Sequence, residues 1–147
     1  MMTPRRMTGE LESRLHGPHS EEHTVQTAFL AAECVRFLNY AAGTADSSGL
    51  PYPGTAYDVT GNLQLAAQRL PQLFDLMVAR MRADNGDGLL AASDRDPETV
   101  TDLVEDFAVA LAEADRAAGV LAAALGRAQS ALSDVNGRGP GREDGAL

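Results

Sequence analysis

DPETVTDLVEDFAVALAEADRAAGVLAAALGRAQSALSDV, residues 96–135, is the stretch that decides the fold. Asp96 and Pro97 are residue types that helices favour at the N-cap and at the first helical position. Apolar residues then recur at alternating steps of three and four and fill ten successive a and d positions: Val104, Phe107, Leu111, Ala114, Ala118, Leu121, Leu125, Ala128, Leu132 and Val135. The adjoining g column is apolar too, with Leu103, Ala110, Ala117, Ala124 and Ala131. This pattern predicts one helix of about 38 residues with a wide apolar face.

A shorter helix is predicted over 20–42, where Ser20 is a favourable N-cap and Gly43 is the natural C′ stop. Its apolar stripe comprises Val25, Phe29, Leu30, Cys34, Phe37, Leu38 and Ala41. Cys34 is the one cysteine of the chain, which excludes an intramolecular disulfide. We expect it to be a small buried core residue.

The middle helix is predicted over 55–83, beginning at Thr55 with Asp58 in an arrangement close to a capping box. Its apolar stripe comprises Ala56, Val59, Leu63, Ala66, Leu70, Leu73 and Met77. Because the stripe keeps its phase across Pro71, we favour one long helix kinked at that proline, where the Ala67 carbonyl loses its partner. Two helices broken at Leu70 are the alternative.

The composition excludes an all-β fold, because aromatic residues make up only 5%, Ile is absent and Ala occurs 25 times. Three antiparallel helices joined by short loops predict an all-α fold, an up-down-up three-helix bundle with a long, proline-kinked second helix and a long third helix. We assign the bundle to residues 19–135. Residues 1–18 are expected to be a flexible N-terminal arm, and residues 136–147 a disordered tail rich in Gly and Arg.

The formal net charge is −9, from 21 acidic residues against 12 basic ones, and every basic residue is Arg. An acidic chain repels nucleic acid and anionic lipid surfaces, so we expect neither as a partner. No run of 18 apolar residues is present, and no apolar segment follows Arg5 and Arg6 as a signal peptide would require. The expected location is therefore cytoplasmic.

Several short pieces of the first two helices resemble a group of uncharacterised small helical proteins of Streptomyces-type actinomycetes. The pieces are FLNY at 37–40, Tyr52-Pro53 with Tyr57, Gly61, and RLPQL at 69–73. The resemblance covers about residues 30–80. It implies a scaffold without an assigned activity, and it therefore carries no catalytic residue over to this chain.

Two segments contain metal-ligand residue types. His16, His19 and His23 are the three histidines, and His19 and His23 are spaced i, i+4. Gly17 and Pro18 interrupt the set, so His19 is expected to precede the helix, and we predict no bound metal or other cofactor. Residues 83–94 are spaced like a calcium loop, but Ala83 occupies the first ligand position, so a turn between two helices is the favoured interpretation.

Acidic residues gather on the first half of the last helix, where they are favourable near a helix N-terminus; no Glu-x-x-His pair accompanies them. The chain also contains no glycine-rich phosphate loop and no nucleophile elbow. We therefore expect a protein that is not an enzyme. Small residues share one column beside the seam of the last helix and permit close approach of another helix. The predicted interaction face comprises Ala112, Gly119, Leu121, Leu125, Gly126 and Leu132.

The favoured function is a helical protein–protein interaction or scaffold module that binds a protein partner or a second copy of itself. A homodimer would cover apolar surface of the last helix that the shorter first helix leaves free. The competing cover is the N-terminal arm, through Leu11 and Leu15. The alternative function is a regulatory protein that binds a small ligand or a metal through the histidine-containing arm. A type VII secretion substrate is less favoured, because the Trp-x-Gly turn is missing.

Overall fold

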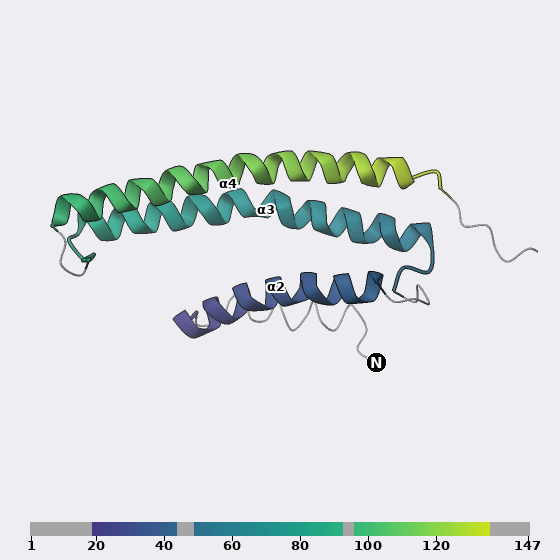
Figure 1. The fold of residues 1–147 in the computed structure, drawn as a ribbon, viewed down its shortest axis with the longest axis horizontal. Helices are drawn as coiled ribbons and strands as arrows, with labels where there is room; N and C mark the ends of the chain where they lie inside the picture. The colour runs from purple at the N-terminus through teal and green to yellow at the C-terminus, as the bar shows by residue number, and fades with distance from the viewer. Residues whose placement is uncertain (1–18, 44–48, 93–95, 136–147) are drawn as a thin grey trace, which may run out of the picture. The chain divides into compact units, whose positions relative to one another are not determined.

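The computed structural model describes residues 19–43, 49–92 and 96–135, and most of them are helical. The helices are α2 (Glu21–Ala42), α3 (Pro53–Gly86) and α4 (Pro97–Leu132) (Figure 1). The predicted all-α class with long second and third helices is confirmed, and the described residues contain no strand. The N-terminal arm and the C-terminal tail lie outside the described residues.

The chain divides into two compact units between Leu50 and Pro51, so that α2 belongs to the first and α3 and α4 to the second. Within the second unit, α3 and α4 pack against each other. Packing of the first helix against these two, which the predicted bundle includes, stays a prediction.

The start of α2 agrees with the sequence prediction. Ser20 is the N-cap, and its hydroxyl oxygen accepts a hydrogen bond from the backbone N–H of His23 at 3.1 Å. Gly43 ends the helix, but with φ of −89° rather than in the left-handed conformation expected of a C′ glycine. Arg36 and Glu33 form an exposed ion pair one turn apart, at 2.6 Å.

The apolar stripe of α2 is exposed, and the helix buries no residue. Phe29, for example, keeps 64% of its surface accessible. The expectation that Cys34 is a buried core residue is wrong, because Cys34 is exposed as well. The physical reason is that the described part of the first unit contains no second helix that could cover this one.

Helix α3 is a single helix that continues through Pro71, as the unbroken phase of its stripe predicts; it is not two helices broken at Leu70. It starts two residues earlier than expected. Pro53 occupies the first turn, and the N-cap, Tyr52, makes no side-chain capping bond, so the predicted capping box at Thr55 is wrong. The fixed φ of a proline suits this position, and the missing N–H costs nothing there because it would have no partner within the helix.

The end of α3 explains the loop that resembles a calcium site. Residues 83–86 are helical, and Gly88 follows the C-cap with φ of +69°. The N–H of Leu89 donates to the Asp84 carbonyl at 2.9 Å, and that of Gly88 donates to the Asn85 carbonyl at 3.0 Å. These two bonds define a Schellman motif, so the segment is a helix stop built on a left-handed glycine.

Helix α4 begins where the sequence predicts and ends three residues short of the predicted Val135. The Asp96 carboxylate caps it by accepting from the Thr99 backbone N–H and from the Thr99 hydroxyl, both at 2.8 Å. Pro97 occupies the first turn. The cap and the proline together start the helix at a defined residue.

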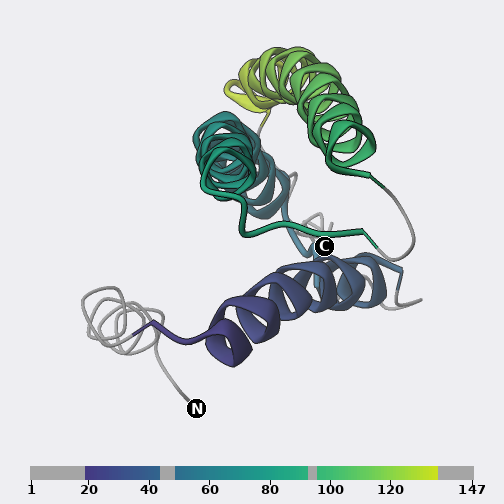
Figure 2. The same cartoon turned by 90° about the vertical axis from the view of Figure 1, so that its left-hand side faces the viewer.

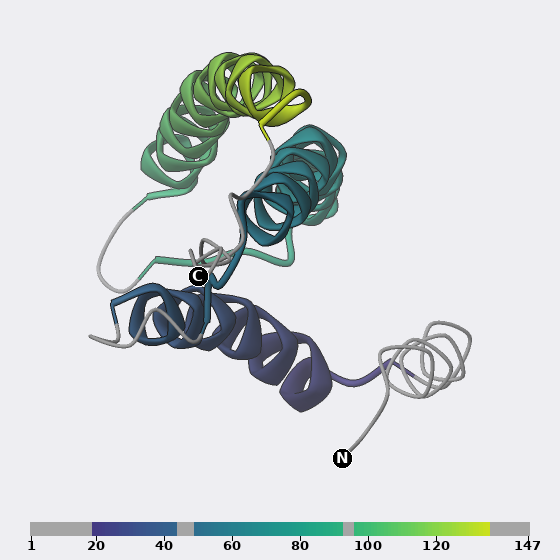
Figure 3. The ribbon, with the colours of Figure 1, turned by 90° about the vertical axis from the view of Figure 1, so that its right-hand side faces the viewer.

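Helices α3 and α4 form an antiparallel hairpin, and they lie side by side along their length (Figures 1, 2 and 3). Small residues make the contact. The buried residues of the described chain are Ala67, Val100, Val104, Ala108, Ala118 and Ala122. Because alanine side chains are short, the two backbones can approach closely, and no large side chain is fully buried between them.

At the end of the hairpin away from the connecting loop, each helix places a glutamine side chain against a glycine of the other helix. The side-chain amide of Gln129 on α4 lies where a Cβ at Gly61 on α3 would be. Reciprocally, the side-chain amide of Gln64 on α3 lies 2.8 Å from the Cβ position of Gly126 on α4. Gln129 also donates to the Tyr57 carbonyl at 3.4 Å. We call this arrangement the Gln–Gly clasp; it sets the register of the two helices far from their connecting loop.

We expect Pro71→Ala to raise the melting temperature, measured by circular dichroism. A proline inside a helix costs about 3 kcal/mol relative to alanine, which exceeds the packing lost from a half-buried ring. Pro53→Ala is the matched control and should change stability little, because its proline lies in the first turn. A clear drop in melting temperature for Pro71→Ala would show that the packing of the proline ring in the hairpin contributes more than the gain in helix propensity.

The Schellman motif predicts opposite effects for two neighbouring glycines. Gly88→Ala places a Cβ in the left-handed region and should cost about 1 kcal/mol in urea unfolding. Gly86→Ala should be neutral or stabilising by up to about 1 kcal/mol, because the residue is helical and a Cβ there meets nothing within 4 Å. Equal effects of the two substitutions would contradict the assigned helix end.

Candidate functional site

The apolar pattern of α4 is wider than its contact with α3. The buried residues of α4 are Val100, Val104, Ala108, Ala118 and Ala122. Three of the residues immediately before the last four of these positions, Leu103, Ala117 and Leu121, are apolar yet exposed, and Leu121 keeps 50% of its surface accessible. The fourth, Phe107, is half-buried. The hairpin therefore uses one edge of the stripe and leaves the other uncovered by α3.

On helix α3, too, one edge of the apolar stripe is buried and the other edge is exposed. Ala67 is buried, and Pro71, Phe74 and Val78 are half-buried along the same side. The residues immediately before these four, Ala66, Leu70, Leu73 and Met77, are all exposed and all apolar. From Ala66 to Met77 the stripe read from the sequence therefore lies one residue to the side of the actual contact line. Its earlier members, Ala56, Val59 and Leu63, are half-buried.

The two exposed edges lie on one face of the hairpin. One residue turns a helix by about 100°, so residues before and after a contact position project to opposite sides. In an antiparallel pair, residues that follow contact positions on both helices share a side. The ion pair between Arg82, which follows Met81, and Glu105, which follows Val104, confirms this at 2.7 Å.

The residues that precede contact positions therefore share the other side. We call this surface the apolar face: Ala66, Leu70, Leu73 and Met77 of α3, with Leu103, Ala110, Ala117 and Leu121 of α4. All eight are exposed. It combines the second half of the predicted stripe of the middle helix with three residues of the g column of the last helix and with Leu121 from the a and d columns.

The structure separates the six residues of the predicted interaction face. Leu121 lies on the apolar face, whereas Leu125 and Leu132 are half-buried. Gly126 lies against Gln64 of the same chain. A Cβ at Gly119 would meet nothing within 4 Å, and Ala112 lines a groove on the side of Arg82.

Sequence reasoning missed the exposed leucines of α3, because it assigned their stripe to the core. The available signal was the width of the apolar pattern on both helices, which exceeds what one contact line can bury.

The histidine set is incomplete among the described residues. His19 precedes the N-cap, as expected, and its ring centroid lies 6.5 Å from that of His23. His16 lies outside the described residues. Within the described part of the chain, no group of three His, Cys, Asp or Glu side chains is placed to hold a metal ion.

Two carboxylates have pKa values below their ordinary range, each through hydrogen bonds. The backbone N–H and the hydroxyl of Thr99 lower the pKa of Asp96. The Arg82 guanidinium lowers the pKa of Glu105 by donating two hydrogen bonds, from Nε at 2.9 Å and from Nη2 at 2.7 Å. Both groups are exposed and hold structure at the loop end of the hairpin.

None of the three described helices combines the length and the apolarity that crossing a membrane requires. Comparison of the chain with family models, with curated proteins and with solved structures finds no match. Function is therefore inferred from the residues and their geometry.

The capping carboxylate predicts a pH dependence of stability. Since the folded pKa of Asp96 is depressed, its contribution is complete above the unfolded value of about 4 and is lost as pH falls through the folded value. Asp96→Asn still offers Thr99 an acceptor, so near pH 7 its urea midpoint should stay close to that of the unaltered chain. Between pH 4 and 2 the variant should lose less stability.

Asp96→Ala is the control, because it removes the cap and should lower the midpoint already at pH 7. Identical pH profiles for Asp96→Asn and the unaltered chain would refute this role of the carboxylate.

Proposed function

We propose that this chain is a non-enzymatic helical interaction module that associates with a second copy of itself through the apolar face of the α3–α4 hairpin. The observation that supports the proposal is the continuity of that face. Leu70, Leu73 and Met77 on α3 lie on the same side as Leu103 and Leu121 on α4, and all five are exposed. Contiguous apolar patches of this kind mark interaction sites on protein surfaces.

Burial would supply the driving force. Fully burying a leucine or methionine side chain contributes about 1.5–3 kcal/mol, so covering several half-exposed ones offsets the free energy that association costs. A two-fold arrangement lets one such face meet its own copy, and it is the commonest solution among soluble oligomers. The two hairpins would then form a four-helix assembly with the leucines at its centre.

The choice of partner follows from charge as well as from shape. A chain of net charge −9 is repelled by nucleic acid and by anionic membranes. A second copy carries the same net charge, so the support for self-association comes from the apolar side chains of the face. Metal binding through the histidine-containing arm has less support, since only the His19–His23 pair is described.

Leu121 and its neighbour Val120 provide a matched test of self-association. Leu121 lies on the apolar face, whereas Val120 is 71% exposed and lies two residues beyond the contact position Ala118, on the outer side of α4. We expect light scattering at micromolar concentration to give a dimeric mass for the full chain and for Val120→Glu. Leu121→Glu should be monomeric, because it places a charge in the centre of the interface.

Circular dichroism should show the same helix content for both variants. A monomeric full chain would overturn the proposal, as would a dimer that Leu121→Glu and Val120→Glu weaken equally. A chain that associates only after removal of residues 1–18 would instead identify the N-terminal arm as the cover of this surface.

A further inference from the structure

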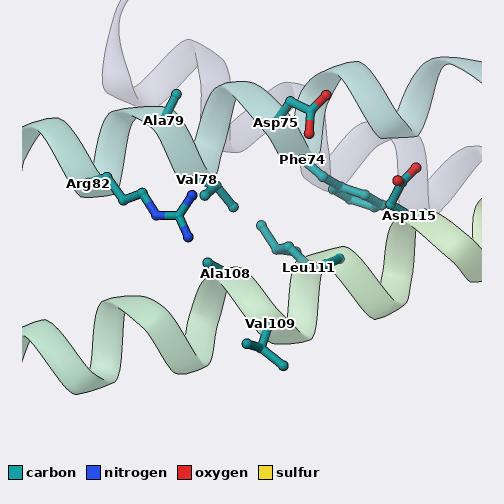
Figure 4. A pocket seen from close by; sticks show the side chains of 10 residues that line it. Phe74, Asp75, Val78, Ala79, Arg82, Ala108, Val109, Leu111 and Asp115 are labelled. Carbon is teal, nitrogen blue, oxygen red and sulfur yellow. The ribbon is translucent and has the colours of Figure 1, made fainter.

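A groove lies between α3 and α4 on the side opposite the apolar face, and its volume is about 380 Å³. Its apolar lining includes Phe74 and Val78 from α3 and Leu111 from α4 (Figure 4). The groove exists because Ala79, Ala108 and Ala112 also line it, and their short side chains leave the space between the helices unfilled. Its volume is in the range of small-molecule sites rather than of a helix-binding surface.

The two ends of the groove differ in charge. Asp75 and Asp115 lie at one end with Phe74 between them (Figure 4). Neither carboxylate forms an ion pair with any residue that the structure describes. Arg82 lies at the other end, two helical turns or about 10 Å along α3. Glu105 neutralises Arg82 through its two hydrogen bonds.

We propose that this groove binds a small organic monocation, a protonated amine that carries an apolar body. The ammonium group lies at the end where two unpaired carboxylates flank an aromatic ring, since both carboxylates and ring faces attract cations. The apolar body lies along Val78 and Leu111. Because Glu105 already occupies the Arg82 guanidinium, the groove presents net negative charge, and an anion of the same shape is repelled.

The site is independent of self-association, because it lies on the other side of the hairpin. A ligand there contacts both helices and therefore stabilises the pair by mass action. The test consequently uses the full chain in its native state of association.

Hexylammonium is the probe, with 1-hexanol and hexanoate as neutral and anionic molecules of the same length. Titrations followed by ¹H–¹⁵N NMR should give a dissociation constant on the order of 1 mM for hexylammonium, as suits a ligand of this size. The shifted amides should lie around residues 74–82 and 108–115. Hexanol should bind more weakly, and hexanoate should not bind measurably.

The double substitution Asp75→Asn with Asp115→Asn removes the two charges without changing side-chain size. It should weaken hexylammonium binding about tenfold and leave hexanol binding unchanged. The control is Asp106→Asn with Glu113→Gln, which changes the net charge equally at exposed positions of α4 outside the groove. Ala112→Leu fills the groove while leaving both carboxylates in place, and it should abolish binding of both probes.

Three results would overturn the proposal: shifts spread over the acidic surface, equal weakening by the two double substitutions, or hexanol binding as tightly as hexylammonium. The first two would show that the acidic chain attracts cations without a site, and the third would show that the carboxylates do not contribute to binding.

Discussion

The contact between Ala67 on α3 and the alanine-rich side of α4 is the interaction on which the rest of the second unit depends. Ala67, with 3% of its surface accessible, faces a line of small residues on α4 that includes Ala118 and Ala122. Small side chains permit close approach but remove little apolar area from water, so leucines such as Leu70, Leu73 and Leu121 are left exposed beside the contact. The exposed apolar face and the groove both follow from that one choice of residue size.

The hairpin is consequently asymmetric about its contact line. The side before the contact positions carries leucine and methionine, and the side after them carries charged residues such as Asp75, Arg82 and Glu105. A protein can thereby present an apolar surface and a charged, hollowed surface on the same two helices. The proposed self-association and the proposed cation site use these opposite sides, so a substitution on one side leaves the other intact.

Much of the fold could be predicted from local chemistry. Ser20 and Asp96 specify helix starts through capping bonds that involve residues three positions on, and the phase of the stripe across Pro71 shows that one helix continues there. The edge of the stripe that meets α3 could not be predicted, because the a, d and g columns of α4 are all apolar. Which of these apolar columns meets α3 depends on how closely the two backbones approach. The prediction that Cys34 is buried is wrong for a related reason. An apolar helical pattern predicts burial, but burial also requires a second element that packs against the helix.

The Gln–Gly clasp closes the hairpin at the end that the connecting loop leaves open. Two helices joined by a loop ordinarily fray at their free ends, because the loop holds them together at the other end alone. Here Gln64 and Gln129 each lie in the notch of a glycine on the opposite helix, so sliding the helices past each other would drive both amides into the backbone of the facing turn. The connecting loop therefore holds the two helices together at one end, and the Gln–Gly clasp holds them in register at the other. Separation of α3 from α4 at this end therefore requires both glutamine side chains to leave the glycines that they contact.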